Sequence, residues 1–236
     1  MHRHTRQTDI YNPKLYKPQT VLILGAGNVG SHVAIVLAKM GIQSLHIIDF
    51  DTIEEHNLGS QAYDYSDIDQ KKIIALQKIV KLQSPETNVK IYDMSAERML
   101  DTPELSNFIT TEHENLIIIS AVDSLEARNA IAEKLQSFPN IPLIDARMGQ
   151  LQTEAHAIMS HEWQSIIPER VDEDPCGGRF ISFTSYVIAG IIGNMVREII
   201  KNGSTESLIM NLHNKMILKP SSLTIPNNAR QQTTAD

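Results

Sequence analysis

One stretch of the sequence, residues 20–49, constrains the fold more than any other. It reads TVLILGAGNVGSHVAIVLAKMGIQSLHIID and opens with an apolar run, Thr20–Leu24, that ends in closely spaced glycines. Apolar residues at helical spacing follow, Gly41 ends that pattern, and a second apolar run, Leu45–Ile48, is closed by Asp49. A buried strand, a helix and a second buried strand within about thirty residues predict a right-handed β-α-β unit of a parallel sheet.

The alternation of strand and helix patterns continues along the chain. Helices are predicted at Lys71–Leu82, Pro103–Ile109, Ser124–Leu135 and Ser182–Lys201. Strands are predicted at Val89–Tyr92, Leu116–Ile119 and Ile141–Asp145, with an added antiparallel strand at 149–159 and a final strand at Leu208–Leu218. The predicted fold is α/β: a doubly wound, Rossmann-like and mostly parallel sheet, extended by antiparallel strands, with helices on both faces.

The 236 residues suit one domain. We expect it to span 1–219, with an N-terminal arm at 1–18, a crossover-like loop at 165–181 and a disordered tail at 220–236. A net charge of −7 does not suggest nucleic-acid binding. The N-terminus has no apolar core region, so it does not resemble a signal peptide. Polar residues interrupt the apolar stretch Tyr186–Ile200, so we expect no membrane span and a cytoplasmic protein.

The glycines between the first strand and helix predict nucleotide binding. Gly25, Gly27 and Gly30 let the backbone approach a phosphate, and the helix that starts near Asn28 offers a positive field. Asp49 is placed to accept hydrogen bonds from ribose hydroxyl groups. The sequence lacks the GxxxxGK[ST] pattern of P-loop enzymes. The glycines do not choose between NAD and ATP, and they would also suit tight helix–sheet packing alone.

The segment GAGNVGS resembles malate and lactate dehydrogenases, so an NAD-dependent oxidoreductase is one interpretation. Such enzymes need a substrate domain and a catalytic histidine with a carboxylate partner. About ninety residues follow Arg147, and the histidines there that might serve, His156 and His161, lack a motif-like setting. The residues after Asp49 favour a different interpretation.

The segment FDTIEEHNLGSQ resembles the D-x-D…N-L-x-R-Q pattern of the ThiF/MoeB/HesA superfamily, which includes the ubiquitin-activating enzymes. The resemblance extends from Val21 to about Met148 and returns in the long helix after Cys176. It implies that Asp49 holds the ATP ribose, that Asn57 lies near the phosphates and that Gln61 closes the segment. Asp51, the second aspartate of the pattern, belongs to the same cofactor-binding set.

Further residues match this family. In SDIDQKKI, Lys72 takes the place of the family's ATP-binding lysine, with Asp69 where relatives have glycine. The D-x-x-x-x-R pattern assigns magnesium and phosphate to Asp123, while Arg128 stabilises nearby loops. Arg6 and Gln7 resemble the family's N-terminal R-Q pair, whose arginine reaches the partner subunit's ATP site.

The resemblance implies a homodimer that uses ATP and Mg²⁺ to adenylate the C-terminal glycine of a ubiquitin-like or sulfur-carrier protein. The family's zinc-binding cysteine pairs are absent, so no zinc is expected. A third interpretation is a catalytically weakened nucleotide-binding subunit that partners an active relative. It rests on Ser60, which replaces the family's phosphate-binding arginine; Lys71, Arg147, or Arg6 of a second copy are the cations available to compensate.

The single cysteine, Cys176, raises the question of a second chemical step. It lies in DEDPCGGRF before the long helix, where relatives carry the cysteine that forms a thioester with the activated partner. Adjacent glycines and Arg179 favour an accessible thiolate, whereas Asp172, Glu173 and Asp174 oppose it. Both a nucleophilic and an incidental role stay open at this point.

Overall fold

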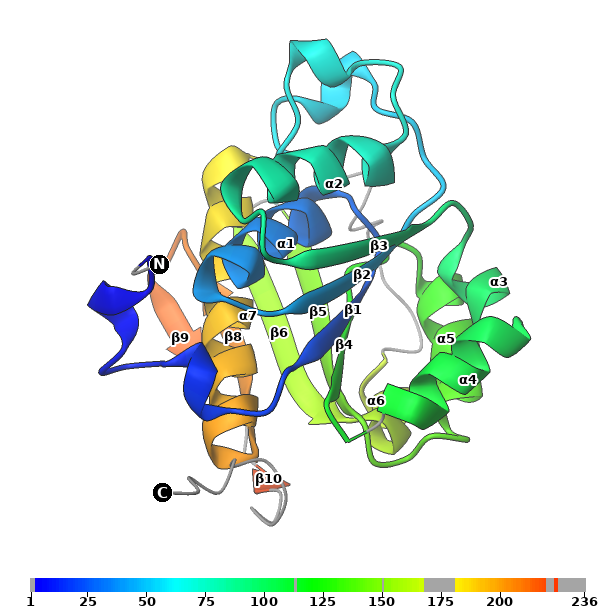
Figure 1. Cartoon of the computed structure of the whole chain (residues 1–236), viewed down its shortest axis with the longest axis vertical. Coiled ribbons are helices and arrows are strands. Elements are labelled where there is room, and N and C mark those ends of the chain that lie inside the picture. Colours follow the sequence, from blue (N-terminus) through cyan, green and yellow to red (C-terminus); the bar gives the residue numbers. More distant parts are fainter. Residues whose placement is uncertain (1–2, 113, 150, 168–180, 220–222, 225–236) are drawn as a thin grey trace.

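The computed structural model describes residues 3–112, 114–149, 151–167, 181–219 and 223–224. Eight strands form one sheet in the order β3-β2-β1-β4-β5-β6-β8-β9 (Figure 1). Their bounds are β1 Thr20–Leu24, β2 Ser44–Ile48, β3 Asn88–Tyr92, β4 Leu116–Ser120, β5 Pro142–Gly149, β6 Gln152–Met159, β8 Ser207–Asn211 and β9 Met216–Leu218. The first five strands in this order are parallel, and the rest are antiparallel.

Helices cover both faces of the sheet (Figure 1). One core layer contains α1 (Asn28–Met40), α2 (Lys72–Gln83) and α7 (Ser182–Asn202). The other contains α3 (Ala96–Leu100), α4 (Pro103–Glu112), α5 (Leu125–Leu135) and the one-turn helix α6 (Trp163–Ile166). The predicted fold class is therefore confirmed.

The central strands of the parallel half are buried on both sides. All five residues of β1 are buried, and they alternate between the two core layers: Val21 and Ile23 face α1, whereas Leu22 and Leu24 face α4 and α5. A strand covered by helices on both faces must be apolar at every position, which is why β1 and β4 read as unbroken apolar runs.

The antiparallel half differs from the prediction in its last part. The strand predicted over Leu208–Leu218 is a hairpin of β8 and β9, and its turn places Lys215 at a φ of 56°. The three residues of β9 are exposed at the sheet edge. By length and composition α7 is apolar enough to cross a membrane, contrary to our expectation, although a buried core helix passes the same test. Its buried residues pack against α1, β5 and β6.

Two segments expected to be irregular contain regular structure. The loop expected at 165–181 begins inside α6, and residues 168–180 lie outside the described part of the chain. In the tail expected to be disordered, Leu223–Thr224 form β10, which pairs with β7 (Ser204–Thr205). Local apolar periodicity cannot reveal strands of two residues, because they depend on a partner distant in sequence.

The N-terminal arm packs where α1 and α2 end. It contains two short 3₁₀ helices, η1 (Thr5–Gln7) and η2 (Pro13–Leu15). The Arg3 guanidinium donates to Glu86 Oε1 at 2.7 Å, and Gln7 Nε2 donates to the Met40 carbonyl at 2.8 Å. The arm therefore lies at the amino-terminal edge of the parallel strands, opposite the edge where the glycine loop lies.

Candidate active site

Three loops meet at the carboxyl ends of the parallel strands, the place where doubly wound sheets bind ligands. They are the glycine loop after β1, a long loop of residues 49–71 after β2, and residues 121–124 after β4. Strands β2, β1 and β4 are adjacent in the sheet, so these loops are neighbours. Most of the predicted site residues belong to them.

The glycine loop needs its glycines for different reasons. Gly25 has a φ of +97°, and a Cβ there would lie 2.8 Å from the Ala121 carbonyl oxygen. A Cβ at Gly30 would lie 1.9 Å from the Gly25 carbonyl oxygen, so the start of α1 could not pack against the loop. A Cβ at Gly27 would have nothing within 4 Å. Open space at Gly27, beside the N-terminus of α1, suits the approach of a phosphate group.

Asp49 fixes the shape of this loop. Its carboxylate accepts hydrogen bonds from the backbone N–H groups of Ala26 at 2.6 Å and Asp51 at 2.8 Å. Burial raises the pKa of Asp49, while the Ala26 hydrogen bond and the positive charge of Lys72 oppose that shift. Each carboxylate oxygen keeps further acceptor capacity, which leaves Asp49 able to receive ribose hydroxyl groups.

Lys72 and Asp51 form an ion pair beside Asp49. Lys72 Nζ lies 2.7 Å from Asp51 Oδ2, and the Lys72 backbone N–H donates to the Asp51 carbonyl at 3.0 Å. The lysine side chain is 9% exposed and the aspartate 48%. Asp69, which replaces a family glycine, has a φ of 68°, the left-handed conformation that glycine adopts without strain and aspartate tolerates. The chain thus keeps the turn that places Lys72 beside Asp51.

The loop between Asp51 and Lys72 folds onto the glycine loop. Its ends are joined by a bridge between Thr52 and Lys71. Tyr63 donates its hydroxyl to the Ala26 carbonyl at 2.7 Å, and burial raises the pKa of Tyr63 well above its usual value, so the phenol stays a donor. The Ala62 N–H donates to Ser31 Oγ at 3.2 Å. These contacts hold the loop against the start of α1.

Asn57, Ser60 and Gln61 lie in this loop. Asn57 is buried, and its Oδ1 accepts from the Glu54 N–H at 2.9 Å. Ser60 Oγ donates to Asn28 Oδ1 at 2.7 Å, so the hydroxyl that replaces the family arginine is used inside the chain. The Gln61 side-chain oxygen is buried without a hydrogen-bond partner among the described residues.

Two cations that could have replaced the missing arginine are engaged elsewhere. Lys71 Nζ donates to the Phe50 carbonyl at 2.6 Å and lies 3.1 Å from Asp93. Arg147 donates to the buried carboxylate of Asp145 at 2.6 Å. These contacts do not direct either cation to the phosphate side of the glycine loop. The hypothesis that Lys71 or Arg147 compensates for the missing arginine therefore finds no support.

Asp123 lies in the third loop and is exposed to solvent. Ser124 follows it and caps α5, because its Oγ accepts from the Ala127 N–H at 2.9 Å. Arg128 donates to the Val122 carbonyl and to Asp145, and it reaches the Ala146 carbonyl at 3.0 Å. Arg128 therefore contacts the loops near Asp123, as the resemblance implied.

Asp145 is a residue that the sequence analysis did not select. It is fully buried in β5 and accepts from Arg128 and Arg147. The available signal was an ionisable residue inside the apolar run IPLIDARMG, because a buried charge requires partners.

Arg6 and Cys176 do not join these loops within the described structure. Arg6 is exposed in η1, next to the residue that bonds the end of α1. The 13 residues of α1 span about 20 Å, so Arg6 cannot reach the glycine loop of its own chain. Cys176 lies outside the described residues.

A magnesium ion would fit Asp123 through the chemistry of its ligands. No group of three or more His, Cys, Asp or Glu side chains able to hold a metal occurs among the residues that the structure describes. Magnesium in nucleotide sites takes one or two carboxylates, and phosphate oxygens and water complete its shell. An exposed carboxylate at the strand ends suits that role.

Comparison with known proteins assigns the chain to a family. The model of the ThiF family matches residues 13–233, so the chain belongs to the ThiF family. The NEDD8-activating enzyme E1 catalytic subunit of Schizosaccharomyces pombe is 31% identical over 149 residues, 59% of this chain and 31% of that protein. The adenylyltransferase and sulfurtransferase MOCS3 of Caenorhabditis briggsae is 28% identical over 200 residues, 83% of this chain and 45% of that protein.

The chain spans less than half the length of these two relatives. Solved structures share the fold at lower identity. A structure of Escherichia coli MccB with MccA-N7isoASN has a TM-score of 0.71 at 19% identity, covering 93% of this chain and 71% of that one. A structure of PaaA has a TM-score of 0.70 at 19% identity, covering 93% and 82%. The resemblance read from the sequence is confirmed at the level of family and fold.

Proposed function

We propose that this protein adenylates the C-terminal glycine carboxylate of a ubiquitin-like or sulfur-carrier protein, using ATP and Mg²⁺. The observation that carries the proposal is the placement of Lys72. The loop of residues 49–71 brings this buried lysine back beside Asp49 and Asp51, at the edge of the glycine loop. A nicotinamide site has no need of a cation there, whereas a triphosphate does.

The reaction would use the chain's residues as follows. The partner's carboxylate attacks the α-phosphorus of ATP, an acyl–phosphate bond forms, and the bond to pyrophosphate breaks. Lys72 would leave Asp51 and neutralise charge that develops on the phosphate oxygens, while backbone N–H groups at the start of α1 orient the phosphates. Magnesium held by Asp123 would add further positive charge. No general base is needed, because the carboxylate is already ionised at neutral pH.

Assembly into a homodimer would complete the site. Arg6 cannot reach the nucleotide site of its own chain, so the cation missing at Ser60 would come from Arg6 of a second copy. Subsequent transfer of the partner to Cys176 as a thioester belongs to the same proposal. There the thiolate would attack the acyl carbon and release AMP.

ATP–pyrophosphate exchange tests the adenylation step. We expect exchange that depends on a carrier protein ending in Gly-Gly, when purified chain is assayed with ATP, Mg²⁺ and a panel of such carriers. Asp123→Ala should abolish it. Binding of NAD without ATP binding, and without exchange for any carrier, would support the oxidoreductase interpretation instead.

Two further outcomes separate the parts of the proposal. Exchange that appears only after a related chain is added would identify a weakened binding subunit. For the thioester step, Cys176→Ala should eliminate a carrier adduct that thiols release, while exchange continues. An unchanged adduct in that variant would refute the thioester step alone.

A further inference from the structure

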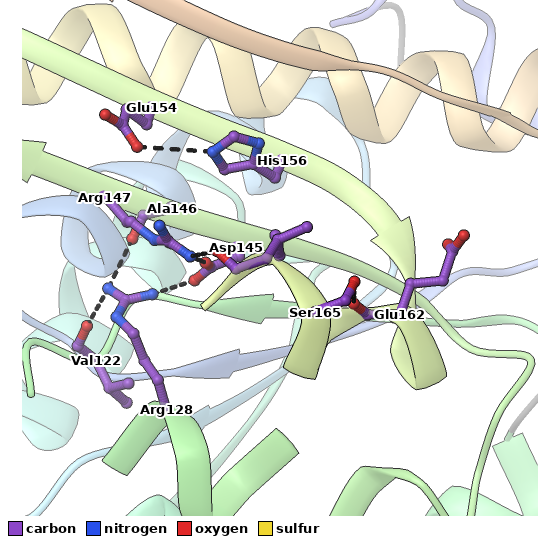
Figure 2. Close-up of polar contacts among 10 residues, drawn as sticks. Val122, Arg128, Asp145, Ala146, Arg147, Glu154, His156, Glu162 and Ser165 are labelled. Carbon is purple, nitrogen blue, oxygen red and sulfur yellow. Dashed lines mark hydrogen bonds and ion pairs between the residues drawn. The ribbon is translucent and has the colours of Figure 1, made fainter. Parts of the chain in front are cut away.

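The buried carboxylate of Asp145 lies at the centre of a polar cluster (Figure 2). Arg128 donates to one of its oxygens. Arg147 donates to the other through Nε at 2.9 Å and Nη2 at 2.6 Å. The two arginine side chains are only 8% and 19% exposed, and Asp145 is 0% exposed. Two cations therefore share one carboxylate.

Each arginine also binds the backbone of a different segment. Arg128 donates to the Val122 carbonyl, in the loop that carries Asp123. Arg147 donates to the Ile166 carbonyl at 3.0 Å, at the last residue of α6. Val122 and Ile166 are 44 positions apart in the sequence, but the arginines that bind their carbonyls both bind Asp145.

Neighbouring strands complete the charge balance of the cluster. In the antiparallel register of β5 and β6, Arg147 faces Glu154 and Asp145 faces His156. His156 Nε2 lies 3.6 Å from Glu154 Oε2, and the pKa of Glu154 is lowered mainly by its bond to His156 and further by Arg147. Arg147 thus has a second anion, Glu154, nearby. Because its charges are balanced within the fold, the cluster is suited to holding segments together.

The burial of the cluster makes its contacts interdependent. Removing one partner of a buried ion pair leaves a charge that water cannot reach, so the remaining groups must rearrange. A displacement of Arg147 would change the contacts available to Asp145 and hence to Arg128. This chain of contacts is continuous from Ile166 to Val122.

We propose that Asp145 is a positioning residue that joins the Asp123 loop and α6 into one rigid unit. A displacement at the end of α6 then shifts the loop at the nucleotide site as well. The mechanical coupling stands on the described contacts alone, while its consequence for nucleotide binding rests on the proposed function.

Hydrogen–deuterium exchange of the full-length protein tests the coupling. In Arg147→Gln we expect amide exchange to rise about tenfold in peptides covering 160–167 and about fivefold in those covering 120–128, with β1 and β2 unchanged. Arg128→Gln should affect the same two regions. If Arg147→Gln accelerates exchange only in 160–167, the coupling through Asp145 is refuted.

Matched variants loosen each segment without touching Asp145. The Glu162 carboxylate accepts from the Met159 N–H at 2.8 Å, before α6 begins. Glu162→Ala removes this contact but leaves the Arg147–Ile166 bond in place, so it should accelerate amide exchange at the start of 160–167 and not in 120–128. Ser124→Ala removes the cap of α5 but leaves the Arg128–Val122 bond in place, so it should accelerate amide exchange only in 120–128. A direct contact also joins the two regions, from Gln164 Nε2 to Asn129 Oδ1 at 2.8 Å. If Gln164→Ala affects both regions and Arg147→Gln does not, this other contact carries the coupling.

The functional consequence has a separate measurement. Isothermal titration with ATP and Mg²⁺ should give a Kd about tenfold weaker in Arg147→Gln and an unchanged Kd in Glu162→Ala, with partial recovery in Arg147→Lys because a cation returns. In the ATP–pyrophosphate exchange assay of Arg147→Gln, the KM for ATP should rise more than kcat falls. If the wild-type protein shows no pyrophosphate exchange, the proposed function fails while the deuterium-exchange result still decides the coupling. An unchanged Kd in Arg147→Gln would overturn the link to the nucleotide site.

Discussion

Two ion clusters near the carboxyl ends of the strands differ in their exposure to solvent, and this difference suits one to function and the other to stability. Lys72 is nearly buried, but its partner Asp51 is about half exposed, so the pair can open toward a ligand or solvent. Asp145 is completely buried between Arg128 and Arg147, and each arginine also holds a backbone carbonyl. An ion pair with one solvated partner can release its cation to a phosphate, whereas a closed cluster would lose stability if it opened.

The largest expected effect is on the closed cluster. Asp145→Ala should lower the free energy of unfolding by about 3–5 kcal/mol, because it leaves the buried guanidinium of Arg128 and the partly buried one of Arg147 without their anion. Urea denaturation followed by circular dichroism measures the change. Asp51→Ala is the matched comparison and should cost about 1 kcal/mol or less, since its carboxylate is half exposed and Asp49 still lies beside Lys72. Equal losses in the two variants would remove the distinction between the clusters.

The open pair should show the reverse pattern, a large effect on chemistry and a small one on stability. Lys72→Ala should slow ATP–pyrophosphate exchange about 100- to 1,000-fold, because a cation that stabilises transition-state charge contributes about 3–4 kcal/mol. Lys71→Ala is a close control, because that ammonium bonds the Phe50 carbonyl and lies near Asp93. If both lysine variants retain normal exchange, Lys72 does not contact the reacting phosphates.

A histidine outside both clusters should dominate the acid sensitivity of the fold. Burial, and to a lesser extent the positive charge of Lys90, lower the pKa of His46 to about 4. Its Nδ1 lies 2.8 Å from the Tyr92 hydroxyl. The unfolded chain binds the extra proton between about pH 6.5 and 4, so stability falls as the pH is lowered through that window, by up to about 3 kcal/mol. Unfolding of His46→Gln at pH 7 and pH 4 should show a smaller difference than the wild type. An identical pH dependence would assign the acid sensitivity to other groups.

The smallest expected effect is at Ser60. Ser60→Arg would lose the hydrogen bond to Asn28, about 1 kcal/mol, and would restore a cation beside the glycine loop. We expect pyrophosphate exchange to stay intact or to rise by up to about tenfold, a change that corresponds to about 1.4 kcal/mol. A collapse of exchange in a folded variant would show that this loop has been remodelled around the serine.

The central parallel strands could be predicted from sequence because helices cover them on both faces. Continuous apolar runs at 20–24 and 116–119 allow few other interpretations. The β8–β9 hairpin was missed because its turn bends at Lys215, where no glycine marks the positive φ. The short helix α6 was missed because four residues cannot display a helical period.

The candidate site also contains residues that could be predicted from the sequence and one that could not. Residues at fixed distances from the glycine loop, such as Asp49 and Lys72, could be selected because they follow a local pattern along the chain. Asp145 could not, because its role depends on arginines from α5 and from its own strand that meet only in the folded sheet. Its burial was visible in the sequence, but its partners were not.

The docking of the N-terminal arm has a consequence for spectroscopy. Thr8 is exposed beside η1, at the end of the molecule remote from the glycine loop. A dye attached through Thr8→Cys in a Cys176→Ala background would therefore sit far from a fluorescent ATP analogue bound to the same chain. If a second copy supplies Arg6 to that nucleotide, its dye comes closer. Energy transfer that grows with protein concentration would then report the pairing of two chains directly.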